Sequence, residues 1–311
     1  MTDHFDGRRY FNPNGANGPS LWMVPRMLLT RRTRWPVSIP VQPQQPPIVR
    51  EKQVAITSIG HSSFLIQANG TAVLTDPVYA DRASPSQSTG PRRVRAPGVR
   101  FEDLPPVSIV LLSHNHYDHC DLRALLELKR RFEPTFITPI GNGRLLRSAG
   151  IDQVEELDWW NASTRSSIPI TLTPAQHSAA RGLFDRNHAL WGGFLLEVVE
   201  KRIFFAGDSG YGPHFEEIRR RLTPIDLALL PIGAYEPRWF MKDIHMNPEE
   251  AVQAHVDLGA AGSIAMHFGV FQLTTEGIDE PAARLSQALT LRGIPAGDFR
   301  IVDVGASVII E

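Results

Sequence analysis

The chain has 311 residues, 42% of them hydrophobic and 21% charged, and its formal net charge is −1. This composition supplies a sizeable core and excludes a disordered protein, and the balanced charge disfavours a nucleic-acid partner, which usually requires a basic excess. The only cysteine, Cys120, excludes an intrachain disulfide and a cysteine-based zinc finger. The sequence shows neither a long apolar run nor a secretory leader, so we expect a cytoplasmic protein.

Residues 1–49 are expected to form an arm rich in proline and arginine, ahead of one domain at residues 50–311. The arm holds six arginines against two acids, and five of its prolines fall in residues 36–47, which favours an extended path over a surface. The preferred interpretation packs the apolar residues 21–29 on the domain, because Pro25 interrupts any long amphipathic helix. The alternatives are peripheral contact with anionic lipid at the inner face of a membrane, pairing in a homodimer, and covering of the active-site mouth.

Strands and a few helices follow in chain order. Strands are expected at residues 54–59, 63–67, 71–75, 107–112, 135–139, 168–173, 194–199, 202–206, 227–230, 263–266 and 299–302, and helices at 121–132, 215–221, 248–258 and 280–291. Asn69-Gly70 is a hairpin signal, Asp121 is a good N-cap, and Pro248 after Asn247 is typical of a helix start. This pattern predicts a layered α/β fold.

The segment Ser113–His119 carries four groups that bind metals. His114 and His116 lie two residues apart at the end of a predicted strand, so both imidazoles point to one side. Asp118 and His119 follow on the turn into the next helix. Burying such a cluster without a cation would cost repeated desolvation, so the segment predicts a metal site rather than a solvated polar loop.

Three further candidate ligands, His177, Asp208 and His267, each follow a predicted strand. Strand ends of a layered sheet share one edge, where sites are usually built. The seven ligands then divide between two ions: His114, His116 and His177 on one, Asp118, His119 and His267 on the other, and Asp208 bridging. Nitrogen and oxygen ligands without a thiolate favour two Zn²⁺ ions per chain, with Mn²⁺ or Fe as alternatives.

Two such ions predict hydrolytic chemistry. Paired cations lie about 3.5–4 Å apart, share a water and lower its pKa to roughly 7, so that a bridging hydroxide exists at neutral pH. They also neutralise the charge that grows on a phosphoryl or carbonyl oxygen. The expected reaction is therefore hydrolysis of an ester-like centre.

The pattern His-x-His-x-Asp-His with the three later ligands resembles the metallo-β-lactamase superfamily, whose fold is a four-layer αββα sandwich. Six further segments are similar to the branch of N-acyl-phosphatidylethanolamine-hydrolysing phospholipases D: Thr75-Asp76-Pro77, RASPSQ at 82–87, Gly90-Pro91, ELDWW at 156–160, FFAGD at 204–208 and PIGAYEPRWFMK at 231–242. The resemblance covers about residues 50–311. It implies zinc at the seven positions above and a phosphodiesterase that releases an N-acylethanolamine and phosphatidic acid from a lipid.

Asp118, Asp208 and His245 are the expected catalytic residues. His245 precedes the helix predicted at 248–258, where it would contact a phosphate or protonate the leaving alkoxide, the alternative being a loop histidine. The same metal site would equally serve a lactonase or another carboxylic ester hydrolase. A non-enzymatic metal-binding protein is the third alternative.

Asp76 and Tyr235 are the expected substrate-binding residues. Asp76 is also placed to hydrogen-bond a metal-ligating histidine, or simply to start a turn before proline. Tyr235 would line the pocket or serve as packing. His61, which follows Gly60 between two predicted strands, is expected to be structural, as lone histidines usually are, the alternative being a place near the site. The five arginines of residues 82–100, which include no acid, suggest a rim for an anionic head group, the alternative being a solvated loop.

Overall fold

Two β-sheets lie face to face in the computed structural model, which describes residues 3–16, 18, 21–182 and 184–311. The first sheet, in spatial order, comprises β13 (Ser307–Ile310), β1 (Val54–Gly60), β2 (Ser63–Ala68), β3 (Thr71–Thr75), β4 (Ile109–Leu111), β5 (Thr135–Pro139) and β6 (Val154–Leu157). The second comprises β12 (Phe299–Arg300), β11 (Ser263–Met266), β10 (Leu227–Pro231), β9 (Lys201–Phe205), β8 (Gly193–Val198) and β7 (Ile170–Thr173).

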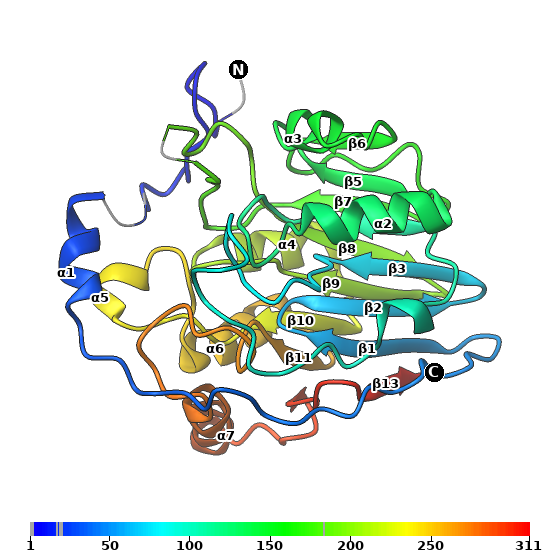
Figure 1. Ribbon diagram of the computed structural model, residues 1–311. Helices are drawn as coiled ribbons and strands as arrows, with labels where there is room; N and C mark the ends of the chain where they lie inside the picture. The colour runs from blue at the N-terminus through cyan, green and yellow to red at the C-terminus, as the bar shows by residue number, and fades with distance from the viewer. Residues whose placement is uncertain (1–2, 17, 19–20, 183) are drawn as a thin grey trace.

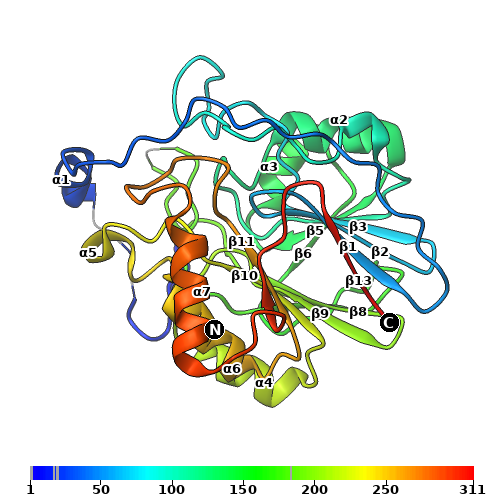
Figure 2. The ribbon, with the colours of Figure 1, turned by 90° about the horizontal axis from the view of Figure 1, so that it is seen from below.

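Helices cover the outer face of each sheet, as Figure 2 shows. The first sheet is covered by α2 (Leu122–Phe132) and α3 (Gly143–Ser148), and the second by α4 (His214–Leu222), α6 (Pro248–Leu258) and α7 (Glu280–Arg292). Two short helices, α1 (Val24–Leu28) and α5 (Arg238–Met241), lie side by side at one end of the molecule (Figure 1). Two 3₁₀ turns occur at Leu21–Met23 and Phe101–Asp103. The predicted four-layer αββα sandwich is confirmed.

The strands read as continuous apolar runs because both of their faces are buried. In β2, Phe64 and Ile66 lie in the core between the sheets, together with Phe194 of the second sheet. Leu65 points the other way and packs in a separate cluster with Leu125 of α2. This arrangement is typical of a sheet that carries another layer on each side.

Most predicted elements form at the predicted places, and the differences have local causes. The strand predicted at 107–112 is confined to β4 at Ile109–Leu111, and the helix α6 begins at Pro248 with Asn247 as its N-cap, as predicted. The strand β6 was not predicted, because its sequence Val-Glu-Glu-Leu lacks an apolar run; it pairs with β5 on one side only, at the edge of the sheet. Short elements with little apolar pattern escape periodicity arguments.

The N-terminal arm lies along the surface of the sandwich and bonds to several of its loops. The Asn12 side chain donates to the His177 carbonyl and accepts from the His177 amide, and the Trp35 indole donates to the Glu276 carbonyl. The Gln44 amide donates to the Gly98 carbonyl. In the part of the chain that the structure describes, no helix is long and apolar enough to cross a membrane.

Candidate metal centre

The predicted ligands converge at one edge of the sandwich because each follows the end of a strand. His114 comes after β4, His177 after β7, Asp208 after β9 and His267 directly after β11. Gly207 allows the loop that carries Asp208 to approach the loop that carries His114. Its φ is +61°, and a Cβ there would lie 2.8 Å from the Cβ of Ser113. A larger residue would therefore push Asp208 away from the His114 loop.

Three imidazole nitrogens form the first cluster. The Nδ1 atom of His116 lies 2.9 Å from Nε2 of His114 and 3.2 Å from Nε2 of His177. His114 and His177 are buried, whereas His116 is partly exposed at the mouth of the site. Three nitrogens that face one common point are the donor set of a tetrahedral metal site with one open position.

A carboxylate and three imidazoles form the second cluster. The Oδ2 atom of Asp118 lies 3.1 Å from Nε2 of His61, 3.5 Å from Nε2 of His119 and 3.3 Å from Nε2 of His267. His61, expected to be structural, is therefore part of the site. Its carbonyl accepts a hydrogen bond of 3.0 Å from the His267 amide, which ties the ends of β1 and β11 together.

Asp208 lies between the two clusters. Its Oδ2 atom is 3.0 Å from Nε2 of His119 and 3.1 Å from Nε2 of His267. The same oxygen is 3.9 Å from Nε2 of His114 and 3.8 Å from Nε2 of His177. One carboxylate oxygen thus faces both donor sets, which is the position of a bridging ligand.

The donor set fits metal ions because buried polar atoms of the site lack other partners. Among the described residues, Oδ1 of Asp208 is buried without a hydrogen-bond partner, and Nε2 of His119 faces the carboxylates of Asp118 and Asp208. Unpaired buried polar atoms are costly, and a cation contacting them would remove that cost. Three site residues also adopt left-handed backbone angles: φ is +59° at His61, +34° at Asp76 and +60° at His267. Such angles cost of order 1–3 kcal/mol each and cluster at functional sites.

The charge distribution at the site also suits cations. Burial lowers the pKa of His114 well below its ordinary value and that of His177 to about 3, so both present neutral lone pairs. Burial alone would raise the pKa of Asp118 and Asp208, but the adjacent His119 lowers the pKa of both well below the usual range. Against the effect of burial, the same carboxylates raise the pKa of His119 well above its ordinary value and that of His267 to about 9, so a metal that binds there would displace a proton from each ring.

Asp76 orients two of these histidines from beneath the site. Its carboxylate accepts from Nδ1 of His119 at 2.6 Å, and from the amide and the hydroxyl of Ser113 at 2.7 and 2.6 Å. The same hydroxyl lies 2.9 Å from Nδ1 of His114. These bonds leave Nε2 of both rings free for a metal. Asp76 is fully buried, so the structure corrects its assignment as a substrate-binding residue.

We expect Asp76→Asn to weaken metal binding about 10- to 100-fold, because the carboxylate accepts with both of its oxygens, whereas the amide has one acceptor oxygen and would turn an NH₂ donor toward another donor. Competition with a colorimetric zinc chelator measures the change. Asp81→Asn, which removes an exposed carboxylate, is the matched control and should keep the wild-type affinity for zinc. Equal affinities in both variants would contradict the orienting role.

His245 is buried beside Asp208 and the two clusters. Its Nε2 atom is 3.9 Å from Oδ2 of Asp208, and its ring centroid is 5.1 Å from those of His177 and His267. Arg238 of α5 fixes this loop by donating to the His245 carbonyl at 2.8 Å. Nδ1 of His245 is buried without a hydrogen-bond partner among the described residues.

Tyr235 does not face the metal cluster. Its side chain is completely buried, its hydroxyl donates to Glu280 of α7 at 2.8 Å, and the Arg284 guanidinium lies 4.8 Å from its ring centroid. These contacts join the loop after β10 to α7. The expectation that Tyr235 contacts substrate is therefore wrong, and packing, the alternative, describes its position.

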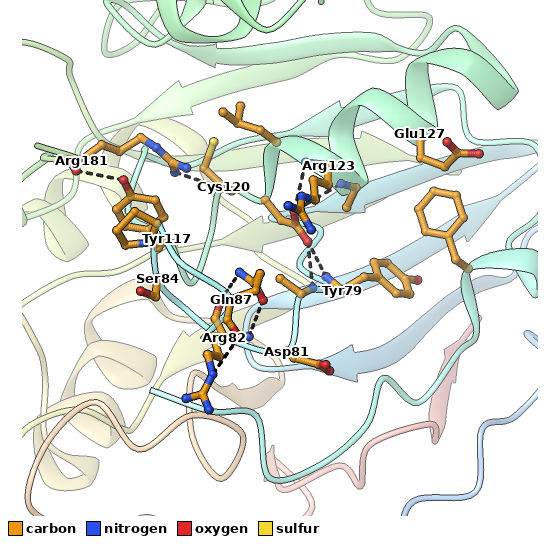
Figure 3. Close-up of a pocket in the computed structure, with 16 residues that line it drawn as sticks. Tyr79, Asp81, Arg82, Ser84, Gln87, Tyr117, Cys120, Arg123, Glu127 and Arg181 are labelled. Carbon is orange, nitrogen blue, oxygen red and sulfur yellow. Dashed lines mark hydrogen bonds between the residues drawn. The ribbon is translucent and has the colours of Figure 1, made fainter. Parts of the chain in front are cut away.

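A cavity of about 550 Å³ lies between the start of α2 and residues 79–87 (Figure 3). It adjoins residues 114–120, which carry four of the predicted metal ligands and which we call the ligand loop. Tyr117, Cys120 and Arg181 line the cavity, but none of the seven predicted ligands does. Arg181 bonds to the ligand loop here. Its Nη1 atom donates to the carbonyls of Asn115 and Cys120, both at 2.9 Å, and its guanidinium lies 3.9 Å from the Tyr117 ring centroid. The Tyr117 hydroxyl donates to the Arg181 carbonyl in return.

Removing these Arg181 contacts in Arg181→Ala should lower the free energy of unfolding by about 2 kcal/mol, since two carbonyls lose a charged donor. Urea denaturation measures the change, and Arg181→Lys should recover only part of it, because an ammonium lacks the planar fork. Arg92→Ala, at an exposed arginine, is the control. If Arg181→Ala were as stable as the control, the Arg181 contacts would contribute nothing to the free energy of unfolding.

The arginines of residues 82–100 mostly bond to the protein itself. Arg93 is buried and donates to the Val78 and Ala80 carbonyls, and Arg82 donates to two carbonyls of its own loop. Arg95 bonds to the Gly269 carbonyl, and Arg100 pairs with a carboxylate three residues on. These bonds argue against the interpretation of the arginines of residues 82–100 as a rim that binds an anionic head group.

Comparison with known proteins identifies relatives of the same kind. The chain matches the family described as "Beta-lactamase superfamily domain" over residues 71–268. It is 39% identical over 268 residues to "N-acyl-phosphatidylethanolamine-hydrolyzing phospholipase D 1" of Caenorhabditis elegans, a match that covers 82% of this chain and 75% of that protein. The mitochondrial N-acyl-phosphatidylethanolamine-hydrolyzing phospholipase D of Saccharomyces cerevisiae is 36% identical over 236 residues, covering 74% of this chain and 50% of that protein. Among solved structures, Igni18, a metallo hydrolase of Ignicoccus hospitalis, shares the fold with a TM-score of 0.62 at 23% identity, over 83% of this chain and 99% of that one.

Proposed function

Because the chain belongs to the metallo-β-lactamase superfamily, in the branch of the N-acyl-phosphatidylethanolamine-hydrolysing phospholipases D, we propose that it is a dinuclear zinc phosphodiesterase acting on such lipids. The observation that carries the proposal is the position of Asp208. One oxygen of its carboxylate faces the nitrogens of both clusters at 3.0–3.9 Å. A single metal would need only one of the two clusters.

The ligand assignment follows the two clusters. His114, His116 and His177 would hold one ion, Asp118, His119 and His267 the other, and Asp208 both; His61 is a further donor beside the second ion. When bound, paired divalent cations supply a nucleophilic water at neutral pH and neutralise charge on a phosphoryl oxygen. Zinc suits these nitrogen and oxygen donors, with Mn²⁺ or Fe as alternatives.

The protein's own groups would position the substrate and exclude side reactions. His245, beside Asp208, would hydrogen-bond a phosphoryl oxygen or pass a proton to the leaving oxygen. The buried Asp76 network would keep His114 and His119 in the tautomer that presents Nε2 to the centre. A lipid phosphodiester is the proposed substrate because the two relatives named above are phospholipases by name.

Turnover of defined substrates tests the proposal. Zinc-loaded protein should hydrolyse N-acyl-phosphatidylethanolamine in detergent micelles, and also the soluble diester bis(p-nitrophenyl) phosphate, and chelation should abolish both activities. Hydrolysis of lactones or carboxylic esters alone would overturn the phosphodiesterase assignment in favour of an esterase. Zinc binding without turnover of any ester would favour a metal-binding protein.

A further inference from the structure

Two large apolar side chains that flank the short helix α1 point away from the protein. Trp22 is 92% exposed and Leu29 is 88% exposed, and Pro25 and Arg26 between them are exposed as well. The spacing of these four residues puts them on one side of a helical turn. Met27, on the opposite side, is buried. The prediction that this segment packs its apolar side chains on the domain is therefore wrong for Trp22 and Leu29.

The helix α5 extends this face with a second indole. Trp239 is 39% exposed, and the Arg26 guanidinium lies 4.4 Å from the centroid of its ring, which joins α5 to α1. Both figures of the whole molecule show the two helices projecting from the same end (Figures 1 and 2). We name the surface formed by Trp22, Leu29, Trp239 and Arg26 the indole face.

Basic residues without acidic partners flank the indole face. Residues 21–34 contain four arginines and no acid. Arg31, Arg32 and Arg34 are exposed, and none forms an ion pair with any residue that the structure describes. Lys242 is exposed at the end of α5. Indoles and leucine surrounded by arginine are the composition of a surface that enters the head-group region of an anionic bilayer.

The indole face is linked to the candidate metal centre through α5. Met241, at the end of this helix, accepts a hydrogen bond of 2.9 Å from the His245 amide. The Ile244 carbonyl, in the same turn, lies 2.9 Å from Nδ1 of His177. A bilayer that contacts α5 would therefore lie next to the loop that supports two histidines of the site.

We infer that the indole face docks the protein on anionic phospholipid bilayers. The choice of a lipid surface over a second copy of the chain rests on charge complementarity, since a self-complementary contact would oppose arginine to arginine. The further claim that the docked bilayer supplies substrate to the metal centre rests on the proposed function, because a lipid phosphodiesterase must reach its substrate in a membrane. Docking itself is measurable without turnover.

Cosedimentation of the full-length chain with vesicles tests the inference. Wild-type protein should bind phosphatidylcholine vesicles that contain phosphatidylglycerol, bind pure phosphatidylcholine more weakly, and dissociate as salt rises. Replacing Arg31, Arg32 and Arg34 by glutamine should weaken binding about a hundredfold, at about fivefold for each charge. The double variant Trp22→Ala/Leu29→Ala should weaken it at least about tenfold. Because all five side chains are exposed, circular dichroism should show unchanged folding.

The control is Leu291→Ala, which removes a leucine that is 87% exposed at the far end of α7 and should leave vesicle binding unchanged. Wild-type binding by both multiple variants would overturn the inference. So would a wild-type dimer that becomes monomeric in Trp22→Ala/Leu29→Ala while vesicle binding persists, since the face would then be a subunit interface. Hydrolysis of bis(p-nitrophenyl) phosphate by the wild-type chain is scored separately, so that failed docking and failed catalysis remain distinguishable.

Discussion

Replacing His116 by alanine should remove bound metal and lower phosphodiester hydrolysis by about 10³-fold while the protein stays folded. A catalytic metal is worth several kcal/mol of transition-state stabilisation, and each 1.36 kcal/mol is about tenfold in rate. His116 is partly exposed, and the ring contacts recorded for it are with His114 and His177, so its loss opens no apolar cavity. Metal content by mass spectrometry, initial rates and the melting temperature together measure the effect.

His188→Ala is the matched control, because His188 is exposed on the same loop as His177 and should keep wild-type metal content and rate. A His116→Ala protein that retained full metal and activity would remove His116 from the ligand set. A protein that lost its fold would instead show that the side chain is structural.

Asp208→Asn should have the second large effect, a loss of at least one metal ion and a fall in rate of about 10³-fold. The amide has nearly the same shape but no negative charge, while the histidines around it stay in place. One oxygen of the Asp208 carboxylate lies 3.0 Å from Nε2 of His119 and 3.9 Å from Nε2 of His114, so its charge would hold the two cations together. Titration with zinc, followed by metal counting per chain, separates loss of one ion from loss of both.

Asp243→Asn provides the control for Asp208→Asn, because Asp243 is an exposed carboxylate two residues before His245. It should bind as much zinc as the wild type and turn over at the same rate. Full zinc occupancy and activity in Asp208→Asn would contradict the bridging role.

Much of the site could be predicted from the sequence because its ligands follow a simple rule of position. His177, Asp208 and His267 follow mutually parallel strands of the second sheet, which end at one edge, and His114 follows a strand of the first sheet. The division of ligands into two groups also agrees with the two clusters. A layered α/β fold followed from the order of strands and helices, and the four-layer αββα arrangement followed from the resemblance to a known family.

His61 obeys the same rule, but a structural role was preferred for it over a place near the site. It follows β1, the first strand of the domain, as the other ligands follow theirs, but it stands alone in its segment and lone histidines are usually structural. Only the pairing of the strands brings it to 3.1 Å from Asp118, which lies 57 residues further on. The signal that could have identified it was its place after a strand.

The roles of Asp76 and Tyr235 depend on side-chain direction, which spacing does not determine at a strand end or in a loop. Asp76 turns under His119 because its backbone takes a left-handed angle after β3. Tyr235 turns toward α7 because Glu280, 45 residues away, accepts its hydroxyl. Contacts across such distances in the chain appear only when the whole fold is assembled.

Anomalous scattering at the zinc absorption edge, from crystals grown with zinc, tests the central claim most directly. The account predicts two peaks per chain, one among His114, His116 and His177 and one beside Asp118, His119 and His267, with Asp208 contacting both. A single peak, or none at full zinc saturation, would contradict it.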